Sequence, residues 1–236
     1  MERIDDLQIK GLRIIQDTEL FMFGTDSVLL ADFACVKSGM TVLDIGTGTG
    51  VICFLLYGRC DKARYTGIDI QQKSIQLAEK SRRLNGIEGA IRFICTDLKD
   101  FNEKNSYDLI CSNPPYERLG TGFLGGNDHV LTSRYETTAT LKDIVACSSR
   151  CLKSKGRLCM VYKAERLGEL TVALKEQGLE LKGIRTIHKN AKTAPRLVLI
   201  EAMKDGNLGV KWYPPLIMYN MDGSMSDDMR RIYGEG

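Results

Sequence analysis

The heptapeptide Asp44-Ile45-Gly46-Thr47-Gly48-Thr49-Gly50 lies between an aliphatic run that begins at Met40 and an apolar run that begins at Val51. The first run has the composition of a strand, and the second continues as a helix to Arg59. Three glycines between them let the backbone turn tightly and approach a ligand closely. This order is typical of a doubly wound α/β sheet, in which ligands bind outside the carboxyl ends of the strands.

Short aliphatic runs alternate with helical periodicity along the rest of the chain. We expect strands at residues 40–45, 65–70, 90–95, 107–111, 156–162, 179–188 and 196–203, and helices at 51–59, 71–84, 138–152 and 166–177. This alternation predicts a Rossmann-like, mostly parallel sheet with helices on both faces. About seven residues, 189–195, join the last two strands, which is too few for a parallel crossover. We therefore expect a terminal antiparallel hairpin.

One domain over residues 1–236 is expected, because a single α/β domain can be this long. It would comprise an N-terminal segment, 1–39, with a helix from about Asp26 to Val36, then a core, 40–204, and a C-terminal extension, 205–236. The extension contains Pro214-Pro215 and many Met, Tyr and Asp residues, so we expect it to be loosely structured.

The composition, 43% hydrophobic and 27% charged, is ordinary for a soluble globular protein. The longest apolar run, Val51–Tyr57, is far shorter than the ~20 residues that span a bilayer. The charged start, Met1–Asp6, does not resemble a signal peptide. Eight cysteines form no Cys-x-x-Cys pair and several lie in apolar runs, as reduced core thiols do. We expect a cytoplasmic protein with no membrane contact and no metal.

Asp69 ends the second predicted core strand, 19 residues after Gly50. A carboxylate at this position can accept hydrogen bonds from both ribose hydroxyls of an adenosine. The spacing Gly-x-Gly-x-Gly differs from the Gly-x-Gly-x-x-Gly that makes room for a pyrophosphate. Asp44 would repel a pyrophosphate but tolerates a sulfonium that carries an ammonium group. These features predict S-adenosylmethionine as the cofactor.

The predicted cofactor residues lie at strand ends and before the first helix. Asp97 either binds the adenine amine or caps the turn at Leu98. Thr25 and Asp26 either start the helix or close over the methionine end of the cofactor. The full set is Thr25, Asp26, Asp44, Gly46, Gly48, Gly50, Asp69, Ile70, Asp97, Leu98 and Asn113.

The tetrapeptide Asn113-Pro114-Pro115-Tyr116 directly follows the strand at 107–111. Two prolines cannot continue a central strand, so they stiffen a loop next to the cofactor. If the Asn113 side chain and the Pro114 backbone carbonyl each accept one hydrogen of a planar amine, its lone pair faces the methyl group. Tyr116 can stack on the ring that carries the amine. We predict N-methylation, with Asn113, Pro114, Pro115 and Tyr116 as the catalytic residues.

These motifs resemble those of the Rossmann-like class I amino-methyltransferases, over most of residues 20–204. The resemblance implies a class I methyltransferase fold and methylation of adenine N6, guanine N2 in ribosomal RNA, or a glutamine in release factors. A finer resemblance is to the bacterial methyltransferases of adenine N6 next to the anticodon of valine tRNA. It lies in Phe23–Leu30, Arg134-Tyr135-Glu136 and Pro214–Tyr219, although that family often has a His where Tyr135 stands.

The favoured hypothesis is therefore an adenine N6-methyltransferase of tRNA. A release-factor glutamine methyltransferase is the first alternative, but such enzymes usually carry an N-terminal helical domain, and only about 20 residues precede Phe21. Another RNA amino-methyltransferase, for adenine N6 or guanine N2 of ribosomal RNA, is the second. A DNA adenine methyltransferase usually has a target-recognition domain, for which there is no room. A module that binds the cofactor without activity is the non-enzymatic alternative.

The formal net charge of +3 is too small to identify a partner. Two runs, Arg150–Lys163 and Lys182–Arg196, each contain five Lys or Arg residues and no acid. Basic clusters on one face indicate phosphate binding, with a solvated surface as the alternative. The runs are candidate phosphate contacts for an RNA partner, in particular tRNA.

Overall fold

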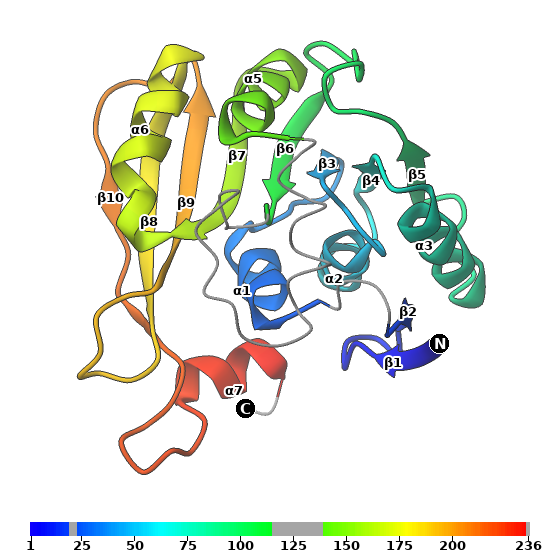
Figure 1. Cartoon of the computed structure of the whole chain (residues 1–236), viewed down its shortest axis with the longest axis horizontal. Coiled ribbons are helices and arrows are strands. Elements are labelled where there is room, and N and C mark those ends of the chain that lie inside the picture. Colours follow the sequence, from blue (N-terminus) through cyan, green and yellow to red (C-terminus); the bar gives the residue numbers. More distant parts are fainter. Residues whose placement is uncertain (19–22, 115–138, 235–236) are drawn as a thin grey trace, which may run out of the picture.

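The computed structural model describes residues 1–18, 23–114 and 139–234. A nine-stranded sheet lies at its centre (Figure 1). Its strands are β3 (Thr41–Ile45), β4 (Arg64–Asp69), β5 (Ile91–Cys95), β6 (Tyr107–Ser112), β7 (Leu152–Lys163), β8 (Leu179–His188), β9 (Leu197–Lys204), β10 (Lys211–Trp212) and β11 (Leu216–Ile217). Their order is β10-β8-β9-β7-β6-β3-β4-β5, and β11 also pairs with β8.

Every strand pair in this sheet is parallel except those of β9, which is antiparallel to both β7 and β8. The predicted parallel sheet with an antiparallel hairpin is confirmed, because the short link between β8 and β9 leaves no room for a crossover. Strands β3, β4, β5, β6, β7 and β8 therefore end at one edge of the sheet, the carboxyl edge, and begin at the opposite one, the amino edge.

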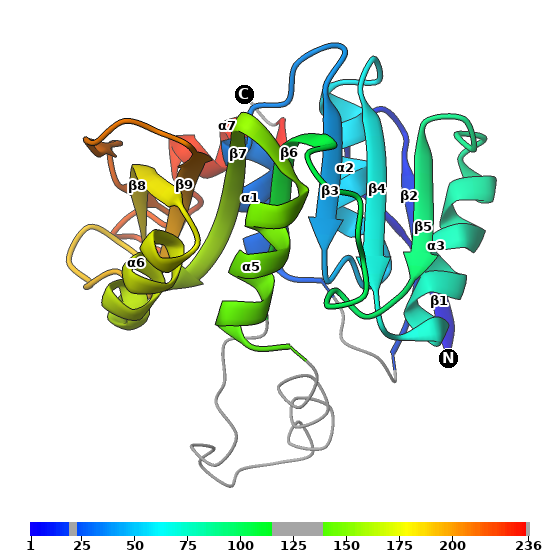
Figure 2. The ribbon, with the colours of Figure 1, turned by 90° about the horizontal axis from the view of Figure 1, so that it is seen from above.

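Helices cover both faces of the sheet (Figure 2). They are α1 (Thr25–Phe33), α2 (Val51–Arg59), α3 (Gln72–Leu84), α5 (Leu141–Cys151), α6 (Leu167–Glu176) and α7 (Asp227–Tyr233), with a 3-10 turn η1 (Ala164–Arg166) before α6. Helices α1, α2, α3 and α7 share one buried apolar cluster, which contains Leu30, Phe54 and Met229. Helices α5 and α6 share the other, with Val145 and Leu174. The glycine loop and the end of β6 lie between the two layers.

The N-terminal segment contains a β-hairpin that the sequence analysis missed. Strands β1 (Glu2–Asp6) and β2 (Arg13–Asp17) pair with each other, and β2 packs on α3. The Ile15 amide donates to Ser81 Oγ at 2.8 Å, and the Arg13 amide donates to Asn85 Oδ1 at 2.9 Å. The predicted helix is present, but it ends at Phe33 instead of Val36, since Cys35 has a φ of +48°.

The C-terminal extension is ordered, so the prediction of a loosely structured tail is wrong. Strands β10 and β11 extend the sheet beyond β8. An edge strand tolerates the neighbouring prolines, because it needs hydrogen bonds on one side only. Helix α7 buries Met229 and Ile232, and Arg185 pairs with Asp228 at 3.1 Å. Two-residue strands and a seven-residue helix carry too little periodicity to be found in a sequence.

All eight cysteines lie in the described residues and are free, and five are buried: Cys53, Cys111, Cys147, Cys151 and Cys159. Cys35 and Cys95 are exposed, so the prediction of core thiols is wrong for these two. Among the helices of the described ranges, none is both long enough and apolar enough to cross a membrane.

Candidate active site

The glycine loop crosses the carboxyl edge between β3 and α2. Gly46 and Gly48 have φ values of +73° and +55°, a region that favours glycine. A Cβ atom added to either residue would meet no heavy atom of the described residues within 4 Å, so the described part of the chain leaves the space above the loop open. Gly50 has a φ of +87°, but a Cβ there would lie 2.6 Å from Phe93 Cζ. Gly50 therefore serves close packing, whereas Gly46 and Gly48 leave room for a ligand.

Substituting Gly50 by alanine should lower the free energy of unfolding by about 1–3 kcal/mol more than substituting Gly48. Both variants suffer the positive φ, but only Gly50→Ala also overlaps the Phe93 ring. Denaturant unfolding of the two variants measures the difference. Equal losses of stability would contradict this account of the loop.

Asp44, the next-to-last residue of β3, is fully buried beneath the loop. Its Oδ2 accepts a hydrogen bond from the Thr47 hydroxyl at 2.6 Å, whereas Oδ1 has no hydrogen-bond partner among the described residues. Burial raises the pKa of Asp44 to about 7, although the Thr47 bond lowers it, and the Asp69 carboxylate raises it further. The site thus holds a buried acceptor with an unused oxygen.

Asp69 is the last residue of β4 and is nearly buried. Its Oδ2 accepts from the Gly48 amide at 2.8 Å and its Oδ1 from the Gln71 amide at 2.9 Å. Burial raises the pKa of Asp69, and these backbone hydrogen bonds oppose the rise. Each oxygen keeps a second lone pair for a ligand. Ile70 follows with 44% of its surface exposed, an apolar side chain left open beside the carboxylate.

The remaining predicted cofactor residues lie at the same edge. Asp97 Oδ1 accepts from the Lys99 amide at 2.8 Å, so this side chain does cap a turn. The neighbouring Leu98 packs against the cluster under α5 and α6. Thr25 and Asp26 begin α1, but the N-cap is Gly24, whose position has no side-chain capping bond. A role of these four residues in cofactor binding stays a prediction.

Asn113 follows β6 at the centre of the carboxyl edge. Its side-chain nitrogen donates to Ser27 Oγ at 3.1 Å, which fixes the plane of the amide. The preceding Ser112 hydroxyl donates to the Ile45 carbonyl at 3.0 Å and ties the end of β6 to the end of β3. Pro114 is buried. The other two predicted catalytic residues, Pro115 and Tyr116, lie outside the described residues.

The contact between Ser27 and Asn113 was not predicted from the sequence, because 86 positions separate the two residues. Ser27 is 3% exposed on the first turn of α1. No motif in the sequence links the two residues, and only their convergence at the carboxyl edge reveals the contact.

We expect Ser27→Ala to lower kcat by about 3- to 10-fold, the cost of one orienting hydrogen bond, with little change in KM for the cofactor. Ser27→Thr keeps the hydroxyl and should recover part of that rate. Ser148→Ala removes another buried serine hydroxyl, on α5, and serves as the control for stability. Equal losses of kcat in the Ala and Thr variants would rule out the positioning role.

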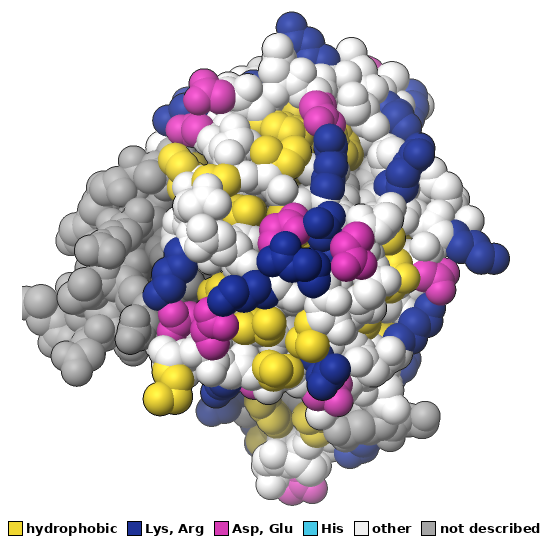
Figure 3. All heavy atoms as spheres, turned by 90° about the vertical axis from the view of Figure 1, so that its right-hand side faces the viewer, with side chains coloured by type: hydrophobic (Ala, Val, Ile, Leu, Met, Phe, Trp, Pro, Cys, Tyr) yellow, Lys and Arg dark blue, Asp and Glu magenta, His cyan; other side chains and the backbone are white. Residues whose placement is uncertain are grey.

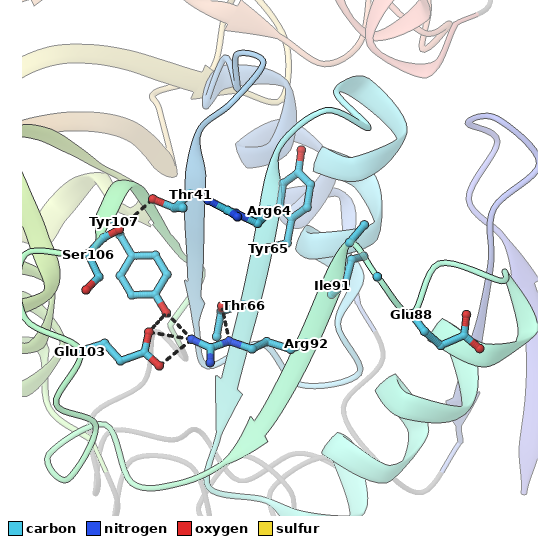
Figure 4. Close-up of a pocket in the computed structure, with 12 residues that line it drawn as sticks. Thr41, Arg64, Tyr65, Thr66, Glu88, Ile91, Arg92, Glu103, Ser106 and Tyr107 are labelled. Carbon is cyan, nitrogen blue, oxygen red and sulfur yellow. Dashed lines mark hydrogen bonds and ion pairs between the residues drawn. The ribbon is translucent and has the colours of Figure 1, made fainter.

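A cavity of about 290 Å³ lies at the amino edge, away from these residues (Figure 4). Thr41, Arg64 and Tyr107, which begin β3, β4 and β6, line it. Within it, Arg92 donates to the Glu103 carboxylate at 2.5 Å and to Thr66 Oγ1 at 3.0 Å. Three of its polar side chains thus pair with one another, and none of the predicted site residues lines it.

Comparison with known proteins identifies the family. A family model described as a methyltransferase domain matches residues 36–213. The chain belongs to this methyltransferase family. The match covers the glycine loop, Asp69 and Asn113, so the residues gathered at the carboxyl edge belong to a methyltransferase.

Two similar proteins carry the same name, tRNA1(Val) (adenine(37)-N6)-methyltransferase. One, from Flavobacteriaceae bacterium (strain 3519-10), is 27% identical over 203 residues, which cover 86% of each chain. The other, from Phocaeicola vulgatus, is 27% identical over 191 residues, which cover 81% of this chain and 80% of the relative. Both similarities extend over most of the methyltransferase.

Solved structures support the class I methyltransferase fold. A predicted O-methyltransferase from Agrobacterium tumefaciens superposes with a TM-score of 0.72 at 18% identity, over 89% of this chain and 95% of that one. A SAM-dependent methyltransferase from Aquifex aeolicus superposes with a TM-score of 0.55 at 17% identity, over 75% and 89%. At these identities the likeness concerns the fold alone, and it agrees with the predicted Rossmann-like architecture.

The cofactor of the methyltransferase is S-adenosylmethionine. The residues at the carboxyl edge fit this cationic group. Asp44 offers a buried carboxylate oxygen that no described residue uses, and Gly46 and Gly48 border open space. Asp69 presents a second carboxylate beside the exposed Ile70. A positively charged sulfonium and ammonium match the Asp44 carboxylate and ribose hydroxyls match that of Asp69, whereas a pyrophosphate would be repelled by both acids.

Proposed function

We propose that this methyltransferase transfers a methyl group to N6 of adenine in tRNA. The observation that carries the proposal is the position of Asn113. Its amide is held by Ser27 at the end of β6, next to β3, which carries Asp44, one of the predicted cofactor residues. When bound, S-adenosylmethionine supplies an electrophilic methyl group on a sulfonium.

The chemistry requires orientation more than a strong base. The lone pair of an exocyclic adenine amine is delocalised, so the amine is a weak nucleophile. An amide oxygen at Asn113 and the Pro114 carbonyl can accept its two hydrogens and aim the lone pair at the methyl group. Transfer leaves a cationic amine, which loses a proton to solvent. Asparagine suits this role, because an ionised carboxylate would hold the cationic product tightly.

The choice of RNA rests on the relatives, which are named as tRNA adenine-N6 methyltransferases. The tail segment Pro214–Tyr219, part of the resemblance to that family, contributes an ordered edge strand, β11. Methylation of a glutamine in a release factor is the alternative, since the NH2 group of its amide is also planar and has a delocalised lone pair. A tRNA substrate also implies a cytoplasmic location.

A partition experiment tests the substrate class. The protein is incubated with S-adenosylmethionine labelled in the methyl group and with separate pools of undermodified tRNA, ribosomal RNA and release factor. We expect label in the tRNA pool. Label confined to the release factor or to ribosomal RNA would overturn the proposal.

A further inference from the structure

The carboxyl edge of the sheet is divided by charge at β6. On the cofactor side, Asp44 is next to last in β3, Asp69 ends β4, and Asp97 follows β5. On the other side, β9 and β8 meet this edge with the basic residues Arg196, Lys189 and Lys192, whereas Lys163, which ends β7, pairs with Glu165 at 3.9 Å. Asn113, which follows β6, stands at the boundary. A cationic cofactor suits the first half, and a polyanion suits the second.

Many other basic side chains of the two runs are held by the fold. Arg150 donates to the Leu98 and Phe101 carbonyls, and Lys182 donates to backbone carbonyls of the segment before β10. Lys153 pairs with Asp108 at 2.8 Å, and Arg157 pairs with Glu201 at 2.7 Å. The runs therefore do not act as whole phosphate-binding segments, and only part of each is available to a partner.

Lys189, Lys192 and Arg196 are exposed and have no ion-pair partner within residues 1–18, 23–114 and 139–234. The loop that carries them is braced. The Asn190 amide donates to Thr193 Oγ1 at 3.1 Å, and the His188 ring contacts the Thr193 carbonyl oxygen at 2.7 Å. The loop backbone is thus held in place, and the cationic side chains project from it. Less conformational entropy is therefore lost when the loop binds a partner.

The C-terminal extension continues this surface. The Met218 amide donates to the His188 carbonyl and the Tyr219 amide to the Lys189 carbonyl, both at 2.9 Å. Figure 1 shows the β8–β9 and β11–α7 connections together at this end of the molecule. Tyr219 is 38% exposed, an aromatic side chain next to Lys189. Asp222, the acid of this loop, already accepts from the Ser224 amide and hydroxyl.

The opposite end of the molecule has a different character. On the face formed by α3 and the β1–β2 hairpin, basic side chains lie beside acidic ones (Figure 3). Among them, Arg82 pairs with Glu79 at 2.7 Å and Lys73 with Asp17 at 2.7 Å. Part of the positive charge on this face is thus paired, although Arg13 and Arg83 are exposed and have no ion pair within the described residues.

We propose that Arg196, Lys189, Lys192 and Tyr219 form a track that holds single-stranded RNA beside the adenine to be methylated. The track follows the order of the strands from β6 to β11, four steps of ~4.8 Å or about 19 Å in all. Lysine and arginine neutralise phosphates, and an exposed tyrosine can stack on a base. This inference rests on the proposed function, since it assumes an RNA substrate.

The test compares a triple variant, Lys189→Ala with Lys192→Ala and Arg196→Ala, with a matched control, Lys37→Ala with Lys62→Ala and Lys104→Ala. The control removes the same charge from exposed residues of the amino edge. We expect the track variant to raise KM for tRNA at least tenfold, with kcat within about twofold. The slope of log affinity for tRNA against log salt concentration should become shallower by roughly 0.7–0.9 for each phosphate contact that is lost. Tyr219→Ala should raise KM several-fold, and Tyr219→Phe should not.

Unchanged KM and salt slope in the track variant, with a wild-type enzyme that methylates tRNA, would overturn the track alone. A wild-type enzyme that methylates only protein would overturn the proposed function first, and the track with it. Equal losses in the track and control variants would show a general charge effect and also reject the track.

Discussion

Asn113→Ala should lower kcat for methyl transfer by roughly 10²–10³-fold, while the affinity for S-adenosylmethionine changes by less than about threefold. The substitution removes a hydrogen-bond acceptor from the reacting amine and leaves the carboxylates at Asp44 and Asp69 intact. The lost hydrogen bond orients the amine in the transition state. The substitution therefore lowers kcat more than it lowers the affinity for the cofactor.

Single-turnover rates and calorimetric titration with the cofactor measure the two quantities separately. Asn102→Ala, at an exposed residue near the amino edge, is a matched control and should leave both unchanged. A kcat for Asn113→Ala within a few-fold of the wild-type value would contradict the proposed role of Asn113.

Asp44→Asn is expected to have opposite effects on binding and on stability. Loss of the charge should weaken cofactor binding by about 1.5–3 kcal/mol, or roughly 10- to 150-fold. The cofactor-free variant, however, should be more stable than the wild type at pH 8. There the wild-type protein buries an ionised carboxylate, whereas the variant buries a neutral amide that can still accept the Thr47 hydrogen bond.

The gain in stability is expected because burial raises the pKa of Asp44 to about 7 from an ordinary value of 3.8. Between these values the folded protein holds a proton that the unfolded chain releases, so stability falls as pH rises from about 4 to 7. Over this pH range the wild-type protein loses about 4 kcal/mol of folding stability. In the variant, an amide hydrogen without an acceptor would cost about 1–3 kcal/mol and offset part of the gain. Thermal unfolding at pH 5 and pH 8 measures it, and the gain should be confined to the higher pH.

Cofactor affinity should show the complementary pH dependence. In the wild type, binding of a cation favours ionised Asp44, so affinity should rise with pH and level off above about pH 7. In Asp44→Asn this dependence should be lost. An unchanged cofactor affinity in the variant, or a destabilised cofactor-free protein at pH 8, would show that Asp44 does not supply a buried charge for the ligand.

The core of the fold could be predicted from the sequence because glycine and proline residues mark where its strands end. The glycines at 46, 48 and 50 and the prolines after Asn113 end strands for reasons that hold in any context. Predicted strand ends at Ile45 and His188 coincide with those of the structure. The antiparallel direction of β9 was predicted from the short connection, residues 189–195, between β8 and β9.

The rest depends on contacts between distant parts of the chain. Ser27 reaches Asn113 only after α1 has packed against the sheet, and β1–β2 depends on hydrogen bonds with α3. The basic runs looked uniform, but the fold uses Arg150 and Arg157 for its own carbonyls and acids. Sequence shows where charges occur, and only the structure shows which of them are already paired.

Nucleoside analysis of the product decides whether the methyl group is transferred to N6 of adenine in tRNA. Undermodified tRNA is incubated with the protein and with S-adenosylmethionine that carries a deuterated methyl group, then digested and analysed by mass spectrometry. We expect labelled N6-methyladenosine with the wild-type protein and none above background with Asn113→Ala. A label on another nucleoside, or on a glutamine of an added release factor and not on tRNA, would contradict the proposed function.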